Sequence, residues 1–304
     1  IIIPNFLEVV DIAGLVKGAS NGEGLGNQFL GHIRGVDAVI AMLRCFEGDG
    51  VSHVEGSVDP IRDADIVETE LLLADLESLE RRAEHMHRRI KGGDHREKVS
   101  YDLMMQVLEA LREGHPAREV DYRGEEAPFF KDLALLTAKP ILYVCNVDEG
   151  SAAKGNEHSE KVIKRALNEG AEAVVISAAI ESEIAQLESS REKTEFLATL
   201  DLDQTGLSKV AEAGDRLLDL VTFLTTGPKE SRSWSVPNGS TAPQAAGTIH
   251  SDFEKGFICA ETISYHDFVT FGGEQAAKDA GKMRQEGRDY VVEDGDVILF
   301  RFNV

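Results

Sequence analysis

Cysteine is scarce in this sequence, since Cys45, Cys145 and Cys259 are the only three in 304 residues. They lie far apart and in no spacing typical of a metal site, which argues against a disulfide scaffold or a cysteine-ligated zinc site. No apolar run approaches the roughly 20 residues that span a membrane, and the apolar opening from Ile1 to Pro4 is too short for a signal peptide. We therefore expect reduced thiols, no membrane partner and a cytoplasmic location.

Basic residues are few as well. The sequence has 32 lysines and arginines against 54 aspartates and glutamates, for a formal net charge of −22. This balance argues against DNA binding and against any nonspecific nucleic-acid binding, because both depend on neutralising phosphates. A local basic face remains compatible with it, so any contact with RNA must come from a restricted patch. The hydrophobic content of 42% and the length are typical of a globular protein with two or three domains.

The printed sequence also lacks the phosphate-binding loop Gly-x-x-x-x-Gly-Lys-Ser/Thr. Gly281-Lys282 is followed by Met283, and neither Gly18 nor Gly22 has Lys-Ser/Thr at the required distance. The backbone N–H groups of that loop cradle the phosphates of a nucleotide, and its lysine reaches the β- and γ-phosphates. A chain without the loop is not expected to hold phosphates by this route.

The stretch from Glu8 to Gly18 carries the first positive signal. A β-branched run, Val9 to Ile12, predicts a buried strand with Asp11 near its C-terminal end. In open α/β sheets, ligands bind outside the carboxyl ends of the strands, where a carboxylate can hold magnesium directly or through water. Gly14 lets the chain turn and can bring a backbone N–H close to a terminal phosphate. By itself, Asp-x-x-Gly more often marks an ordinary turn.

Apolar runs predict three more strands, over residues 37–46, 141–146 and 172–179, and their composition is typical of a parallel sheet. The second of these strands ends in Asn146-Val147-Asp148-Glu149, and the third ends in Ser177-Ala178. Ser-Ala at the end of a strand is a weak signal in isolation and is informative only through its order along the chain.

Two further regions have their own patterns. Leucines at helical spacing predict helices at about 69–91 and 99–111, which pair as an antiparallel hairpin with a break at Gly92-Gly93-Asp94. The C-terminal region predicts two strands around a turn at about 223–236. It also predicts a β-hairpin over residues 290–300, with a glycine in its turn.

Taken together, these motifs resemble one family. The string from Asp11 to Ala19, followed by the string from Asn21 to Leu30, resembles the switch II region of the Obg-like P-loop NTPases. It is closest to their YchF branch, the Obg-like ATPases. The string from Asn146 to Glu149 resembles the Asn-x-x-Glu motif of the same proteins. Those from Thr241 to Gly247 and from Asp252 to Ile258 resemble the TGS domain of YchF proteins, a small β-grasp fold.

The resemblance implies an α/β fold of the P-loop NTPase type (Obg/TRAFAC class). A mostly parallel sheet would carry an inserted α-helical hairpin, and a β-grasp TGS domain would follow. The nucleotide-binding domain would take residues 1–68 and 127–220, the inserted helical coiled-coil domain 69–126, and the TGS domain 221–304. In the family, the P-loop with its magnesium-binding Ser/Thr and the switch I threonine lie upstream of the Asp11 strand. We expect that unit to be truncated or to lie outside the printed sequence.

The resemblance also implies roles for individual residues. Asp11 would support a magnesium ion through water, and Ala13 and Gly14 would approach the γ-phosphate. Leu15 stands where Ras-like GTPases carry a glutamine that orients the attacking water. His53 matches the histidine proposed for that task in YchF proteins, and the alternative is a surface histidine without a role. The base pocket would be formed by Asn146, Val147, Glu149, Ser177 and Ala178.

The implied function is magnesium-assisted hydrolysis of ATP to ADP and phosphate by a ribosome-associated, nucleotide-dependent switch. Val147 and Glu149 replace the lysine and aspartate with which GTPases recognise guanine, so we expect ATP to be preferred and GTP to bind more weakly. The helical and TGS domains would contact the ribosome, its large subunit or RNA. Two alternatives remain, a nucleotide-independent adaptor if the P-loop is truly missing, and a GTPase with a divergent base-recognition loop.

Overall fold

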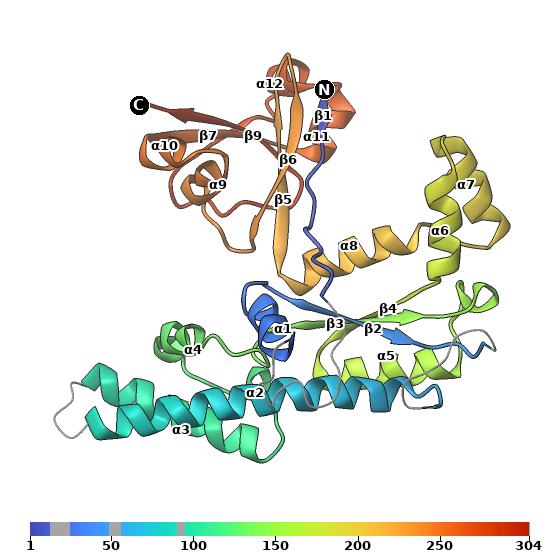
Figure 1. The fold of residues 1–304 in the computed structure, drawn as a ribbon. Helices are drawn as coiled ribbons and strands as arrows, with labels where there is room; N and C mark the ends of the chain where they lie inside the picture. The colour runs from blue at the N-terminus through green and yellow to red at the C-terminus, as the bar shows by residue number, and fades with distance from the viewer. Residues whose placement is uncertain (13–24, 49–55, 90–94, 304) are drawn as a thin grey trace. The chain divides into compact units, whose positions relative to one another are not determined.

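The structure, a computed structural model, divides the chain into two compact units (Figure 1). One unit is Val9–Ala213, and the other combines Ile1–Glu8 with Gly214–Val304. The first eight residues therefore group with the C-terminal part of the chain, while the division into four segments stays a prediction. The residues that the structure describes are 1–12, 25–48, 56–89 and 95–303.

The unit Val9–Ala213 is built on three parallel strands in the order β2-β3-β4 (Figure 1). β3 is buried along its length except at Asn146, as expected of an apolar strand with a neighbour on each side. Leu43, Tyr143 and Cys145 pack with residues of the helices α2 (Pro60–Arg89) and α5 (Glu157–Glu169) in one core cluster. The strands are β2 Val39–Arg44, β3 Ile141–Asn146 and β4 Glu172–Ile176.

The buried strand predicted at Val9 to Ile12 is wrong. These residues are described and form no strand, and the side chains of Val9 and Val10 are 64% and 51% exposed. The short strand β1 (Ile2–Ile3) lies earlier in the chain. It belongs to the C-terminal unit and pairs there in parallel with β6 (Ser231–Pro237). A β-branched run favours extended backbone, but burial also requires a neighbouring strand, which a local pattern does not specify.

The predicted helical hairpin is present, and its first helix is longer than expected. α2 begins at Pro60, where the carboxylate of Asp59 accepts from the backbone N–H groups of Ile61 and Arg62 at 3.2 and 3.1 Å. The helix that lies against the sheet therefore runs without interruption into the hairpin and pairs with α3 (His95–Arg112). The predicted break at Gly92-Gly93-Asp94 lies outside the described residues. The seam includes Leu72, Leu79, Ala83, Leu103, Val107, Leu108 and Leu111.

A buried carboxylate joins α2 to the segment before β3. Asp75 is 1% exposed, and its two oxygens accept from the backbone N–H groups of Leu136 (2.9 Å) and Thr137 (2.7 Å) and from the Thr137 hydroxyl (2.7 Å). Burial raises the pKa of the Asp75 carboxyl above its ordinary value, although these hydrogen bonds and the charge of Arg34 act in the opposite direction. The Thr137 hydroxyl also accepts from the Ala117 N–H at 3.1 Å, so the network extends to the segment after α3.

A charged cluster joins α2 to α5. The guanidinium of Arg165 donates to Glu68 at 2.8 Å and to Glu169 at 2.6 Å, and Arg118 pairs with Glu68 as well. The hydroxyl of Tyr143 donates to Glu169 at 2.8 Å, and burial raises the pKa of Tyr143. Because most of these side chains are largely shielded from water, the cluster fixes the helices more firmly than an exposed ion pair would.

The remaining helices of this unit are short. None of the helices within the described ranges is both long and apolar enough to cross a membrane. α8 starts in this unit, and its first two N–H groups donate to the carboxylate of Glu181 at 2.6 and 3.1 Å. The bounds are α1 Leu25–Arg34, η3 Ala117–Glu119, η4 Gly124–Glu126, α4 Ala127–Leu133, η5 Glu149–Ser151, α6 Ala178–Gln186, α7 Ser190–Thr199 and α8 Gly206–Leu217.

The C-terminal unit holds a mixed sheet in the order β1-β6-β5-β9-β7-β8 (Figure 1). Phe223, Ala260 and Ile298 from three of its strands are buried in one cluster with small residues of α9 such as Ala245. The further strands are β5 Leu220–Thr226, β7 Phe257–Ser264, β8 Arg284–Glu286 and β9 Asp296–Phe302. The helices are α9 Ala242–Ile249, α10 Ser251–Lys255, α11 Tyr265–Phe271 and α12 Glu274–Asp279.

The β-hairpin predicted over residues 290–300 is wrong. β9 pairs in parallel with β5 and antiparallel with β7, and the segment before the glycine turn pairs elsewhere. Val291 forms a single bridge with Thr241, and the Val292 N–H donates to the Ser240 carbonyl at 3.0 Å. The turn at Gly295 was identified correctly. The strand after it pairs with β5 and β7 and not with the segment before the turn, because that pairing buries the apolar residues of β9.

Candidate functional site

The carboxyl ends of the three parallel strands lie in one row. Arg44, Asn146 and Ile176 are aligned by the strand register. The row continues one residue further, because the Cys45 N–H donates to the Asn146 carbonyl at 2.8 Å and the Val147 N–H to the Ile176 carbonyl at 2.9 Å. This is the edge at which open parallel sheets bind ligands (Figure 1).

Asn146 connects two of the predicted site segments. Its side-chain oxygen accepts from the backbone N–H of Ala178 at 2.9 Å, so the end of β3 holds the turn at the start of α6. The structure thus brings together the predicted residues Asn146, Val147, Ser177 and Ala178. The Val147 side chain is only 2% exposed and belongs to the core, so this residue can meet a ligand through its backbone alone.

Asp148 and Glu149 differ in what they contact. The carboxylate of Asp148 accepts from the N–H and the hydroxyl of Ser151, at 3.1 and 2.9 Å, and thereby caps the turn η5. The Asp148 carboxylate is therefore occupied by hydrogen bonds within its own turn. The side chain of Glu149 is exposed, and η5 places it one residue beyond the capping group.

Ser177 carries a feature that sequence reasoning missed. Its side chain is buried, with 3% of the residue exposed, and within the described part of the chain its hydroxyl oxygen has no hydrogen-bond partner. An unpaired buried hydroxyl costs about 1–3 kcal/mol. Such groups often mark the place of a ligand or an ordered water. The motif-based prediction used only the backbone at this position, so it gave no signal for the side chain.

A second asparagine supports the same edge and was also missed. The amide nitrogen of Asn156 donates to the Cys45 carbonyl at 2.6 Å, and its oxygen accepts from the Ser159 N–H at 3.0 Å. Asn156 therefore caps α5 and ties it to the end of β2. The spacing Asn-x-x-Ser before a helix could have indicated the cap, but not the contact with Cys45.

Two cysteines lie buried near this edge. Cys45 and Cys145 are fully buried free thiols. Contact with the Cys45 thiol, together with burial, raises the pKa of the Cys145 thiol, so that this thiol stays protonated.

The other predicted site residues are described only in part. Asp11 is exposed, and its single carboxylate fits magnesium, which in nucleotide sites takes one or two carboxylates together with phosphate oxygens and water. Ala13, Gly14 and His53 lie outside the described residues, so their roles stay predictions. The segments on either side of His53 are anchored, since Arg44 donates to the Phe46 carbonyl at 3.0 Å and Arg62 to the Ser57 carbonyl at 2.6 Å.

Sequence comparison finds extensive similarity to named proteins. A family model named YchF-GTPase_C, described as a protein of unknown function (DUF933), matches residues 220–303. The "Ribosome-binding ATPase YchF" of Haemophilus influenzae is 50% identical over 303 residues, which cover 100% of this chain and 83% of that protein. The protein of the same name from Bacillus subtilis is 48% identical, with 99% and 83% covered. "Obg-like ATPase 1" of Rattus norvegicus is 44% identical, with 99% and 77% covered.

Solved structures with the same fold are also found. The structure of the Schizosaccharomyces pombe YchF GTPase matches with a TM-score of 0.86 at 36% identity and covers 99% of this chain and 81% of that one. A GTP-binding protein from Pyrococcus horikoshii matches with a TM-score of 0.57 at 18% identity, which concerns the fold alone. The predicted fold class is confirmed by the first match.

Proposed function

Because this chain belongs to the YchF family of Obg-like ATPases, we propose that it hydrolyses ATP to ADP and phosphate as a ribosome-associated, nucleotide-dependent switch. The relatives' names support the activity and the association with the ribosome. The observation in this chain that carries the proposal is the hydrogen bond from the Ala178 N–H to the Asn146 side chain, which brings together residues that we propose for the base pocket. The proposal includes a cytoplasmic location and a TGS-type C-terminal domain.

The base pocket is proposed to favour adenine. Guanine-specific sites use an aspartate to accept from N1–H and N2–H₂, and adenine has neither donor. Here the acid at that position is the longer Glu149, while Asp148 is engaged with Ser151 and cannot take its place. Adenine offers an N6 donor and ring-nitrogen acceptors, which backbone groups near Val147 and the Ser177 hydroxyl can meet.

The catalytic end of the site rests on residues named from the sequence. Magnesium, when bound, neutralises charge that develops on the phosphate oxygens. Asp11 would hold it through water, the backbone of Ala13 and Gly14 would contact the γ-phosphate, and His53 would orient the attacking water in place of the glutamine that Leu15 replaces. We propose all of these roles for the intact protein.

We expect ATP to bind more tightly than GTP by at least about tenfold, which corresponds to about 1.4 kcal/mol. Titration calorimetry with magnesium and each nucleotide measures this difference, and an intact-mass determination on the same sample establishes which chain is being titrated. Equal or tighter binding of GTP would contradict the adenine preference and favour a GTPase with a divergent base loop.

The substitution His53→Ala is expected to lower the turnover of ATP by about 100- to 10,000-fold, the range of a lost general acid–base group. The affinity for ATP should change little, because the side chain would act on water and not on the nucleotide. His266→Ala, an exposed histidine of the C-terminal unit, is the control. Unchanged turnover in His53→Ala would remove His53 from the mechanism.

A nucleotide-independent adaptor is the second candidate function. It applies only to a protein that truly lacks the phosphate-binding loop. The same titration separates the two candidates, since a sample with the mass of the printed chain, 33.2 kDa, that binds neither nucleotide would favour the adaptor.

A further inference from the structure

The far end of the helical hairpin is basic in an acidic protein. Residues 81–98 include seven arginines and lysines and three aspartates and glutamates, whereas the other 286 residues hold 25 basic and 51 acidic side chains. Three of the chain's nine histidines, His85, His87 and His95, fall in the same stretch. A polyanion approaching the chain therefore meets net attraction at this end and net repulsion elsewhere.

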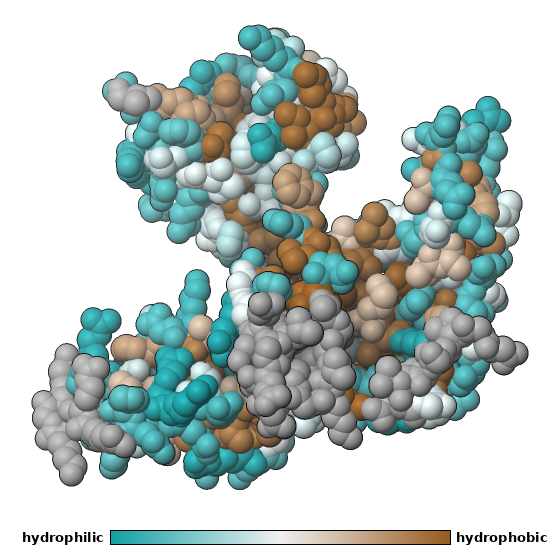
Figure 2. Space-filling view, viewed as in Figure 1, coloured by the Kyte–Doolittle hydropathy of each residue, from teal (hydrophilic) through white to brown (hydrophobic). Residues whose placement is uncertain are grey.

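The length of α2 separates this end from the acidic residues near the start of the helix. Arg81 lies 21 residues after Pro60 in one continuous helix, which places it about 30 Å along the helix axis at 1.5 Å per residue. The Debye length at physiological ionic strength is about 8 Å. Repulsion from charges near the start of α2 is therefore largely screened at the far end. In Figure 2 the surface of the hairpin is predominantly hydrophilic.

Three basic residues of the C-terminal unit, by contrast, are paired with carboxylates of that unit. Lys282 lies 3.4 Å from Asp267, and Arg284 lies 3.3 Å from Glu286. Arg301 contacts Glu261 at 2.8 Å. These carboxylates compensate the three positive charges locally, so the three residues attract a polyanion less than unpaired cations would.

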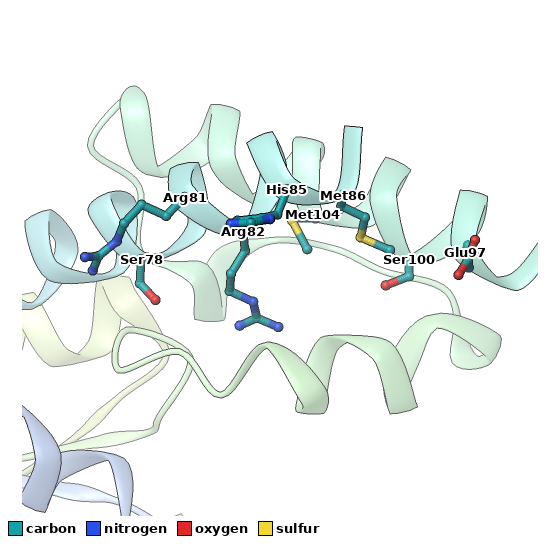
Figure 3. Close-up of a pocket in the computed structure, with 8 residues that line it drawn as sticks. All are labelled: Ser78, Arg81, Arg82, His85, Met86, Glu97, Ser100 and Met104. Carbon is teal, nitrogen blue, oxygen red and sulfur yellow. The ribbon is translucent and has the colours of Figure 1, made fainter. Parts of the chain in front are cut away.

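The hairpin carries an open groove of about 600 Å³ between α2 and α3 (Figure 3). Arg82 extends from α2 and donates to the backbone carbonyls of Leu133 (2.6 Å) and Asp132 (3.2 Å), two neutral acceptors that fix its guanidinium without cancelling its charge. Arg81 is 71% exposed and lies 3.6 Å from Glu77. The groove is lined by Ser78, Arg81, Arg82, His85, Met86, Glu97, Ser100 and Met104.

α3 carries two more cations, one on each side of the groove residue Glu97 in the sequence. Arg96 is exposed, with its guanidinium 5.8 Å from the centre of the Phe129 ring, and Lys98 is exposed two residues later. Arginines, lysines and serine hydroxyls are the side chains that most often contact phosphate oxygens in nucleic-acid complexes. We define the distal hairpin surface as Arg81, Arg82, His85, Arg96 and Lys98.

We infer that the distal hairpin surface binds the phosphate backbone of ribosomal RNA and supplies the main RNA contact of this chain. The inference rests on the proposed ribosome association and assigns that contact to the hairpin, not to the C-terminal unit. Recognition by charge needs no base contact, because the cations of this surface can pair with phosphates of any sequence.

The test compares two double variants that remove the same charge. Arg81→Gln/Lys98→Gln alters two exposed positions of the distal hairpin surface, and Lys255→Gln/Lys278→Gln alters two exposed lysines of the C-terminal unit. Binding of the full-length protein to purified large ribosomal subunits and to protein-free large-subunit RNA is measured across a salt series. The hairpin variant is expected to bind both probes about tenfold more weakly, with a salt slope smaller by about 1.4–1.8, as for two lost phosphate contacts. The lysine control should stay within about twofold of the wild type.

Other results would overturn the inference in distinguishable ways. If the wild type binds the subunits and the hairpin variant binds them equally well, the assignment to the hairpin fails and the proposed function stands. If binding to subunits depends on the hairpin charges but protein-free RNA does not bind, the partner is an acidic protein and the RNA assignment fails. If the wild type binds neither probe, both the inference and the proposed ribosome association fail.

Discussion

Replacing Asp75 by alanine is expected to destabilise the unit Val9–Ala213 by about 4 kcal/mol. The substitution removes the acceptor of three buried hydrogen bonds and leaves the donors at Leu136 and Thr137 without their partner. Each buried donor left unpaired costs about 1–3 kcal/mol, and removing one partner of a buried charged network typically costs 3–5 kcal/mol. Asp75→Asn should lower the free energy of unfolding by a smaller amount, because its remaining oxygen can still accept a hydrogen bond. Some loss remains, since its NH₂ group faces a donor.

Urea denaturation with two optical signals measures this effect. Trp234 is the only tryptophan and lies in the C-terminal unit, so its fluorescence reports there. Far-UV circular dichroism reports mainly on the unit Val9–Ala213, which holds most of the helical residues that the structure describes. The dichroism transition should move to lower urea in Asp75→Ala. Asp102→Ala, an exposed aspartate on α3, is the matched control and should stay within about 0.5 kcal/mol of the wild type. A dichroism transition of Asp75→Ala that coincides with the control would refute the role of Asp75.

The raised pKa of Asp75 adds a pH dependence with a definite sign. The folded protein holds the proton of this carboxyl more tightly than the unfolded chain, whose value is about 3.8. This group therefore favours folding at low pH, and its contribution falls as the pH rises from about 3.8 through the folded-state pKa. Asp75→Asn removes a titrating group, so this component of the pH profile should disappear in the variant.

Asn146→Ala is expected to weaken ATP binding about 30-fold, which corresponds to about 2 kcal/mol. The side chain orders the turn at Ala178 through a 2.9 Å hydrogen bond. Without it the Ala178 N–H loses its acceptor, and the turn that carries the Ser177 hydroxyl is no longer held to the end of β3. The loss combines a hydrogen bond of about 1 kcal/mol with the cost of ordering that turn again when the nucleotide binds.

Two further variants separate this role from a loss of folding. Asn146→Asp keeps an oxygen at the accepting position, so it should retain affinity within about threefold of the wild type, provided that the hydrogen bond is what matters. Asn168→Ala changes an exposed asparagine on α5 and should leave ATP affinity unchanged. Titration calorimetry with ATP and magnesium compares all three. Wild-type affinity in Asn146→Ala would show that the base pocket does not depend on this contact.

The positions of helices and strands are predicted best where the residues of the element itself determine its conformation. β3 and β4 lie where their apolar runs indicated, because a strand with a neighbour on each side is apolar on both faces. The run from Val9 to Ile12 has the same local character, yet it forms no strand and is largely exposed. The prediction failed there because strand pairing depends on a partner that lies elsewhere in the chain.

In the candidate site, too, features set by neighbouring residues were predicted, and contacts between distant residues were not. The string from Asn146 to Glu149 pointed to the correct strand end, but no spacing rule links Asn146 to a backbone group 32 residues later. Asp75 gave no signal, because one aspartate among the leucines of an amphipathic helix is typical of an exposed position. Its burial follows from the docking of the segment at Leu136 and Thr137, which a periodicity argument does not contain.

Because α2 is one uninterrupted helix, a change of its direction at one end displaces its other end. The helix spans 30 residues, or about 45 Å. Its first turn follows directly on the segment that Arg62 anchors at Ser57, and Ala64 packs in the same core as Leu43 of β2. A rigid rod of this length converts a tilt of about 5° at its base into a displacement of about 4 Å at its far end. A small tilt of α2 at the edge of the sheet would therefore move the C-terminal end of the helix, near Arg89, by nearly the spacing between two strands.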